Sequence, residues 1–264
     1  MRAPMVRAAG AAVAVLVTAA ALMTPSSNAA APQRAAHARA AAVTLKAPAR
    51  VDEGDRVVLT GLVRVRPAGG TVTVQRMFKY TGEWRNVGRA KVGGRGGVRF
   101  VDVAHRGGVR YYRLVVPTRH SRVVSKGVAV TVWTWHDLSD EPYSSRLGTF
   151  QRQYVNVLDG IFYDDGIVAD DAIDSGFMEW DLEDTRGVCT KLRAHVASQG
   201  IDYAHGSVLV DGVEVGSGDF VDGYGPFGVS KDISGARSVR FEWSKPADSS
   251  ESLIMYDSAV YCSY

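Results

Sequence analysis

Hydrophobic and polar residues alternate along most of the chain with a period of two. This period is typical of β-strands, whose successive side chains point to opposite faces of a sheet. Between residues 43 and 133 the alternating runs are short, rich in β-branched and aromatic residues, and separated by paired glycines. Such runs predict an antiparallel β-sandwich over residues 43–133. In one of its strands we expect Val98 and Phe100 to face the core, and Arg99 and Asp102 to face solvent.

The same alternation continues from residue 134 to residue 264, where no run has the period of an amphipathic helix of three turns. The residues expected to face the core in two of the strands are Met178, Trp180, Leu182, Val239, Phe241 and Trp243. Asp211 and Gly212 stand between two alternating runs, and Asp-Gly is a strong signal for a two-residue hairpin turn. We therefore predict an all-β protein of two antiparallel sandwiches, the second over residues 134–264.

The first 31 residues have the layout of a secretory signal peptide. Arg2 and Arg7 precede the apolar run Ala8–Met23, and small residues follow as far as Ala31. The apolar run is shorter than the roughly 20 residues that span a bilayer, although an uncleaved anchor is the alternative. We expect cleavage, a disordered mature N-terminus over residues 32–42, and a secreted or cell-wall-associated protein without a transmembrane span.

The net charge of +3 conceals two oppositely charged halves. Residues 43–133 hold 18 Lys and Arg against 5 Asp and Glu, whereas residues 134–264 hold 9 against 23. The cations of the first half could hold an anionic wall polymer, or they could be the solvated outer faces of two sheets. We do not expect nucleic acid as a partner, because the chain shows no aromatic and basic recognition motif.

Four motifs follow one another in the basic half. They are Thr71–Arg76, Trp84 with Val87, Val98–Phe100 after a glycine-rich turn, and Tyr111–Arg113. This order resembles the bacterial Ig-like domains of secreted actinobacterial proteins and covers most of residues 43–133. The resemblance implies an Ig-like fold and a spacer or adhesion role rather than a ligand site.

A second series of motifs runs through the acidic half. It comprises Asp137–Asp140, Ile161–Tyr163, Phe177–Leu182, Cys189–Val196, Gly206–Val208, Val210–Gly212, Val229–Phe241 and a closing strand towards Val260. The order resembles the NPCBM family of carbohydrate-binding modules over about residues 137–262. The resemblance implies a jelly-roll fold and sugar binding.

Cys189 and Cys262 are the only cysteines, which excludes a four-thiolate zinc site and a disulfide-dense scaffold. Export would place them where disulfides persist. We predict a disulfide between them, worth about 4 kcal/mol because the loop it closes is long. No motif around either residue indicates a catalytic thiol.

An acidic segment over residues 163–174 is expected to be a loop. Its five aspartates are Asp164, Asp165, Asp170, Asp171 and Asp174. Calcium prefers several carboxylate oxygens, so these residues could bind it, although their spacing is not that of an EF-hand. A solvated acidic loop without a metal is the alternative, and no other cofactor is expected.

A second segment, residues 219–227, combines aromatic rings, aspartates and glycines. Tyr224 and Phe227 are candidate rings for stacking on a sugar, and Asp219 and Asp222 are candidate acceptors for its hydroxyl groups. Packing of the rings beneath the loop is the alternative.

No catalytic motif accompanies these candidates. The chain has neither a Gly-x-Ser-x-Gly nor a His-Glu-x-x-His sequence. No segment singles out the two carboxylates of a glycosidase. We predict a monomeric, non-catalytic protein that binds glycan or cell-wall polysaccharide through its acidic half. The alternatives are a structural or adhesion protein that makes protein–protein contacts, and a hydrolase whose acidic loop forms an active site.

Overall fold

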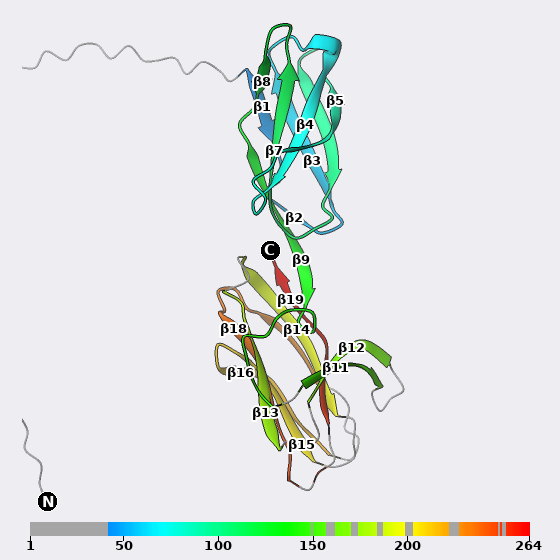
Figure 1. Ribbon diagram of the computed structural model, residues 1–264, viewed down its shortest axis with the longest axis vertical. Coiled ribbons are helices and arrows are strands. Elements are labelled where there is room, and N and C mark those ends of the chain that lie inside the picture. Colours follow the sequence, from blue (N-terminus) through cyan, green and yellow to red (C-terminus); the bar gives the residue numbers. More distant parts are fainter. Residues whose placement is uncertain are drawn as a thin grey trace, which may run out of the picture. The chain divides into compact units, whose positions relative to one another are not determined.

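Strands account for almost all of the regular structure in the computed structural model (Figure 1). The structure describes residues 42–148, 150–156, 162–169, 174–183, 187–198, 203–221, 227–247, 249 and 252–264. Within these residues the one helical element is a short 3-10 turn, Ala68–Gly70, and no helix has the length and apolar character needed to span a bilayer. The all-β prediction is confirmed, whereas the predicted signal peptide and residues 32–41 lie outside the described residues.

The first sandwich consists of two sheets that enclose one apolar core. One sheet contains β1 (Val43–Lys46), β3 (Arg56–Val63) and β6 (Gly97–Val103). The other contains β5 (Arg85–Lys91), β4 (Thr71–Phe78), β7 (Gly108–Pro117), β8 (Arg122–Val124), β2 (Arg50–Asp52) and the first half of β9 (Val128–Asp137). All pairs are antiparallel except β2 with β9. Val57, Leu59, Val74 and Leu114 are almost completely buried between the sheets.

Asp102 does not face solvent as the sequence predicted. The Tyr112 hydroxyl donates to Asp102 Oδ2 over 2.8 Å, and Arg76 donates to the same oxygen over 2.8 Å. A strict period of two places Asp102 on the same face as Val98 and Phe100, and the neighbouring sheet supplies the two donors. Burial, together with the Asp102 charge and hydrogen bond, raises the pKa of Tyr112 to about 12.

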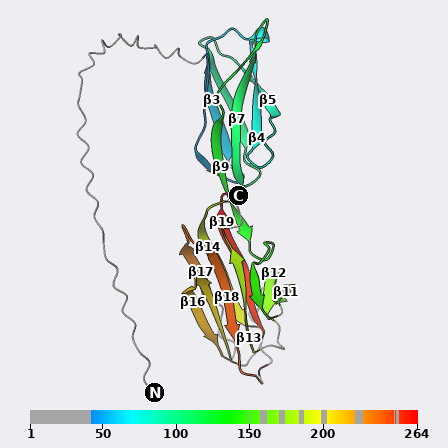
Figure 2. The ribbon, with the colours of Figure 1, turned by 60° about the vertical axis from the view of Figure 1, so that its left-hand side comes forward.

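The second sandwich also has two sheets, whose strands can be followed in Figures 1 and 2. One has the order β10 (Ser145–Leu147), β13 (Ser175–Asp181), β18 (Ser238–Ser244), β15 (Ala204–Val210) and β16 (Val213–Phe220). The other contains β17 (Phe227–Asp232), β14 (Cys189–Ser198), β19 (Leu253–Cys262), β12 (Phe162–Ala169), β11 (Phe150–Asn156) and the second half of β9. We refer to the first as the five-stranded sheet.

The core of the second sandwich confirms the predicted alternation. Trp180 and Trp243 are buried, and so are their predicted companions Met178, Leu182, Val239 and Phe241. The predicted hairpin turn joins β15 to β16, with φ of 52° at Asp211 and 75° at Gly212.

Strand β9 passes from one sandwich to the next. Its residues Val128–Val132 pair with β7, and residues 134–137 pair with β19. The strand therefore crosses the expected boundary at residues 133 and 134 without a break, and residues 41–264 form one compact unit. The division into two domains stays a prediction.

The predicted disulfide joins Cys189 to Cys262 across the paired strands β14 and β19. A register shift lies between Cys189 and Lys191, so the cysteine is buried even though it does not share the parity of Leu192. The bridge ties the final strand to the middle of the sandwich.

Replacing both cysteines, Cys189→Ala with Cys262→Ala, should lower the free energy of unfolding by about 2–4 kcal/mol, because the unfolded chain gains the freedom of a long loop. Urea denaturation with and without a reducing agent measures this. The reduced native chain should approach the stability of the variant, and the variant should not respond to the reductant. Equal stability of the oxidised and reduced native chain would contradict the structural role of the bridge.

Candidate functional site

The five-stranded sheet presents its side chains in rows on the side turned away from the core. Phe177 lies opposite Glu242, and Glu242 lies opposite Ser207 on the next strand. In the neighbouring row Glu179 pairs with Arg240. The members of this surface, which we call the outer face, are Ser145, Phe177, Glu179, His205, Ser207, Leu209, Glu214, Asp219, Arg240, Glu242 and Ser244. Antiparallel register thus brings polar groups from five separate strands onto one surface.

Arg240 holds two carboxylates at the centre of the outer face. Its Nη1 donates to Glu242 Oε1 and its Nη2 donates to Glu179 Oε2, each over 3.0 Å. The guanidinium lies 4.4 Å above the centre of the Phe177 ring, and the Ser145 hydroxyl donates to Glu179 over 3.0 Å. The carboxylates are therefore fixed in position before any ligand arrives.

These contacts also fix the charges. Burial by itself raises the pKa of Glu179, but hydrogen bonds from Arg240 and Ser145 outweigh it and hold that pKa below its ordinary value. Hydrogen bonds to Glu242 and Glu179 raise the pKa of Arg240. At neutral pH the outer face carries ionised carboxylates with further lone pairs available as acceptors.

Asp219, one of the predicted ligand-binding residues, lies at the β16 side of the outer face. The Tyr203 hydroxyl donates to Asp219 Oδ1 over 2.8 Å, and His205 Nδ1 lies 2.7 Å from the same oxygen. Hydrogen bonds from His205 and then Tyr203 lower the pKa of Asp219, and the bond to Asp219 raises the pKa of Tyr203. From the sequence, His205 is one of two histidines, with His195, that could be a ligand or a base, whereas nothing singles out Tyr203. The pairing of β15 with β16 is what brings His205 to Asp219.

Two shallow hollows lie along the outer face. One, of about 390 Å³, is lined by Phe177, His205, Ser207 and Glu242 among others. The other, of about 670 Å³, is lined by Glu179, Leu209, Arg240 and Glu242 among others. Glu242 lines both, so the two hollows are neighbours on the outer face.

Phe227, another predicted ligand-binding residue, is not brought to Asp219. The Phe227 ring stacks on Phe220 with ring centres 5.9 Å apart, and a Cβ added at Gly218 would lie 2.8 Å from Phe227 Cδ1. Phe227 therefore packs on the inner side of β16, whereas Asp219 faces outwards. Asp222 and Tyr224 lie outside the described residues. A binding role for these four residues stays a prediction.

The acidic segment expected to be a loop is a strand over its first part. Phe162–Ala169 form β12, which pairs with β11 and β19. Asp164 and Asp165 lie where the register of β11 and β12 shifts by one residue, so a bulge accommodates two residues of a type that is rare in strands.

The calcium prediction is not tested by the structure. The side chains of Asp164 and Asp165, and the whole of Asp170 and Asp171, lie outside the described part of the chain, while Asp174 is exposed just before β13. Among the described residues no three His, Cys, Asp or Glu side chains gather as metal ligands would. Calcium binding stays a prediction.

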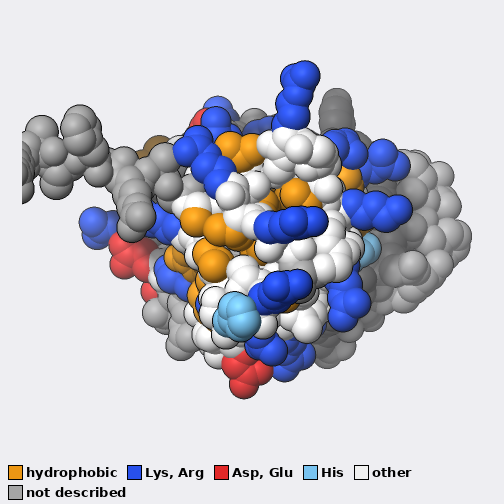
Figure 3. All heavy atoms as spheres, turned by 90° about the horizontal axis from the view of Figure 1, so that it is seen from above, with side chains coloured by type: hydrophobic (Ala, Val, Ile, Leu, Met, Phe, Trp, Pro, Cys, Tyr) orange, Lys and Arg blue, Asp and Glu red, His pale blue; other side chains and the backbone are white. Residues whose placement is uncertain are grey.

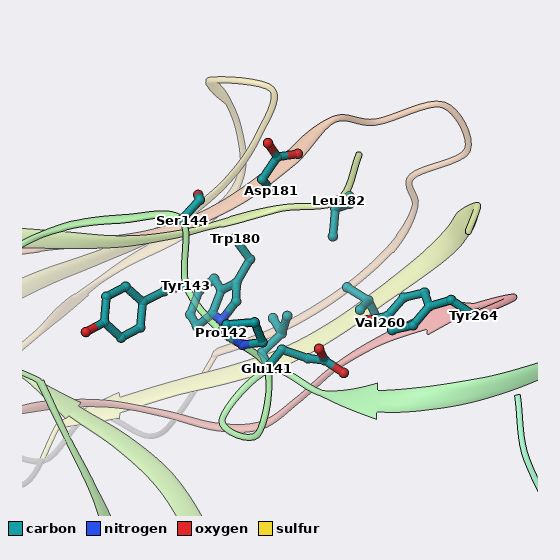
Figure 4. Close-up of a pocket in the computed structure, with 10 residues that line it drawn as sticks. Glu141, Pro142, Tyr143, Ser144, Trp180, Asp181, Leu182, Val260 and Tyr264 are labelled. Carbon is teal, nitrogen blue, oxygen red and sulfur yellow. The ribbon is translucent and has the colours of Figure 1, made fainter. Parts of the chain in front are cut away.

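A more enclosed cavity of about 270 Å³ opens near Glu141 and Tyr264 (Figure 4). Glu141 extends towards Tyr264, and its Oε1 lies 3.1 Å from His136 Nδ1. Burial, with the Glu141 charge, raises the pKa of Tyr264 well above its ordinary value. The inner walls are the core residues Leu138, Leu182 and Val260, and the Trp180 Nε1 donor has no partner among the described residues. The cavity is thus an opening into the core rather than a row of exposed acceptors.

Solved structures that resemble about half of the chain include two carbohydrate-binding modules. One is a carbohydrate-binding module, CBM36, in complex with calcium and xylotriose: it is 13% identical, covers 49% of this chain and 99% of the module, and has a TM-score of 0.28. The other is the CBM36-1 domain of a multidomain xylanase from the hindgut metagenome of Trinervitermes trinervoides, with 10% identity, 49% and 95% coverage, and a TM-score of 0.29. At these TM-scores neither likeness supports a ligand assignment. No family model and no curated protein matches the chain.

Arg240→Gln should lower the free energy of unfolding at pH 7 by about 1 kcal/mol, because two partly exposed charge-assisted hydrogen bonds are lost. The pKa of Glu179 lies below its ordinary value of 4.5, so the stabilisation is present above pH 4.5 and disappears as the pH falls through the folded-state pKa. Urea denaturation at pH 7 and at a pH below the folded-state pKa of Glu179 measures both effects.

Arg237→Gln is the control for this measurement, because its pair with Glu183 is highly exposed and should contribute little. A difference between native and Arg240→Gln protein that stays the same at both pH values would show that the charge of Glu179 is not involved.

Proposed function

We propose that the outer face binds a glycan chain, and that the protein is an exported, non-catalytic glycan-binding protein. The observation that carries the proposal is the pair of hollows that meet at Glu242, lined by acceptors that Arg240 holds in place. An elongated surface of this kind suits an extended polymer better than a small compact ligand.

The chemistry of the outer face matches that of sugar hydroxyl groups. Each hydroxyl can donate to a carboxylate, and the Glu179 and Glu242 oxygens retain acceptor positions beyond those used by Arg240. Because these side chains are already ordered by their mutual contacts, binding would cost little further side-chain entropy. Hydrogen bonds to charged groups are also the stronger kind, which favours them as determinants of affinity.

An aromatic ring borders the same surface. Tyr203 is 44% exposed and is held by its hydrogen bond to Asp219. A sugar ring could stack its apolar face on Tyr203 while its hydroxyl groups meet Asp219. Asp222 and Tyr224 follow β16 by only a few residues, so we retain them as predicted contacts at this end of the outer face.

The charge of the surface narrows the class of glycan. Glu179, Glu214, Asp219 and Glu242 outnumber Arg240, and residues 134–264 as a whole are strongly acidic. A uronate-rich or otherwise anionic polymer would be repelled. We therefore infer a neutral or amino-sugar glycan as the ligand of the outer face.

Glu242→Gln should weaken binding to a neutral polysaccharide about tenfold, because one charged acceptor shared by both hollows is lost. Affinity electrophoresis in gels that contain xylan, soluble chitin, mannan or glucan identifies a binding polymer, and calorimetry with its oligosaccharides gives the affinity. Release of reducing ends by the native chain would overturn the non-catalytic part of the proposal.

Asp257→Asn is the matched control. It also removes a carboxylate paired with an arginine, Arg193, but on the other sheet of the same sandwich. Equal weakening by Asp257→Asn and Glu242→Gln, or the absence of binding to every polymer tested, would overturn the proposed site.

A further inference from the structure

One end of the first sandwich gathers six cationic side chains. The strand register places the ends of β3, β5 and β7 there, together with the starts of β4, β6 and β8. Two hydrogen bonds join the loops at this end: Val63 N donates to Gly96 O over 2.8 Å, and Val92 N donates to Gly70 O over 3.0 Å. The cations, which we call the cationic end, are Arg64, Arg66, Lys91, Arg95, Arg119 and Arg122. All six are exposed. Figure 3 looks down on this end and shows Lys and Arg side chains projecting from several sides of it.

The acidic residues of the same sandwich lie at its other end. Asp52, Glu53 and Asp55 precede β3, Glu83 lies between β4 and β5, and Asp102 lies near the end of β6. No Asp or Glu occurs in the segments that form the cationic end, residues 64–70, 91–96 and 118–122. None of the six cations forms an ion pair with another residue of the described ranges. Cations occur at both ends of the sandwich, but the acids are confined to one, so the cationic end holds positive charge without nearby negative charge.

We propose that the cationic end binds a linear polyanion built from repeating phosphate groups. Five of the six cations are arginines, whose planar guanidinium group donates two parallel hydrogen bonds to one phosphate. Six uncompensated charges on neighbouring loops also raise the local concentration of a polyanion by long-range attraction.

The residues between the cations favour a phosphate polymer without bases over a nucleic acid. Residues 64–70, 91–96 and 118–122 contain no Phe, Tyr or Trp and a single imidazole, His120, so they offer no succession of rings on which consecutive unpaired bases could stack. A polymer whose phosphates are joined by small, non-aromatic units fits this surface.

The first sandwich would thus bind its own ligand, independently of the glycan proposed for the second. The two sandwiches would then bind two chemically different polymers, one neutral and one anionic. Variants at the cationic end should leave glycan binding by the outer face unchanged, so failure of one proposal is distinguishable from failure of the other.

The test uses the purified chain and inorganic polyphosphate as the probe. The triple variant Arg64→Gln, Arg95→Gln and Arg119→Gln should bind polyphosphate about tenfold more weakly at low salt. The slope of the logarithm of the association constant against the logarithm of the salt concentration should be smaller in magnitude by about two to three. The reason is that each lost phosphate contact releases about one counterion fewer. Fluorescence anisotropy with labelled polyphosphate at several salt concentrations measures both quantities, and thermal unfolding confirms that the variant is folded.

The matched control is Arg56→Gln, Lys79→Gln and Arg99→Gln, which removes the same charge from exposed positions outside the cationic end. The control should retain nearly native affinity. If both triple variants lost polyphosphate affinity equally, the loss would reflect net charge alone, and the proposal would be overturned. Absence of polyphosphate binding, or tighter binding of single-stranded DNA of equal phosphate number, would overturn it as well.

Discussion

The in-register pairing of β13, β18 and β15 is the constraint on which the rest of the second sandwich depends. The pairing buries Trp180, Phe241 and Val208 on one side and, with the same period of two, turns Glu179, Arg240 and Ser207 outwards. A slip of one residue would exchange the faces, expose the aromatic core and bury the charged row. The core thus selects the register, and the register assembles the outer face.

Cationic side chains have different roles in the two sandwiches. In the first sandwich the acids lie at one end and six exposed cations at the other, which leaves an uncompensated positive surface. In the second sandwich the central cation, Arg240, is enclosed by two glutamates, so its charge is used to position acceptors. Arginine side chains therefore attract an anionic ligand at long range in the first sandwich, whereas Arg240 positions hydrogen-bond acceptors in the second.

Local pattern was sufficient to predict the strands that contain Trp180 and Trp243, the inward position of both rings, and the turn at Asp211 and Gly212. The disulfide followed from the count of cysteines and the expected compartment. Contacts between distant strands could not be predicted in this way. The outer face arises from five strands whose order along the sheet cannot be read from their local alternation, so Tyr203, the contact of His205 with Asp219 and the Arg240 clamp were missed. Aspartate content suggested a loop at β12, where a bulge instead accommodates the aspartates within a strand.

Mapping of backbone amide shifts by nuclear magnetic resonance, during titration with an oligosaccharide of a bound polymer, tests the central claim most directly. The account predicts that the largest changes fall on residues from different strands that share the outer face, such as Phe177, Ser207 and Glu242. Changes confined to the cavity beside Tyr264, or to Arg193 and Asp257 on the other sheet, would contradict it.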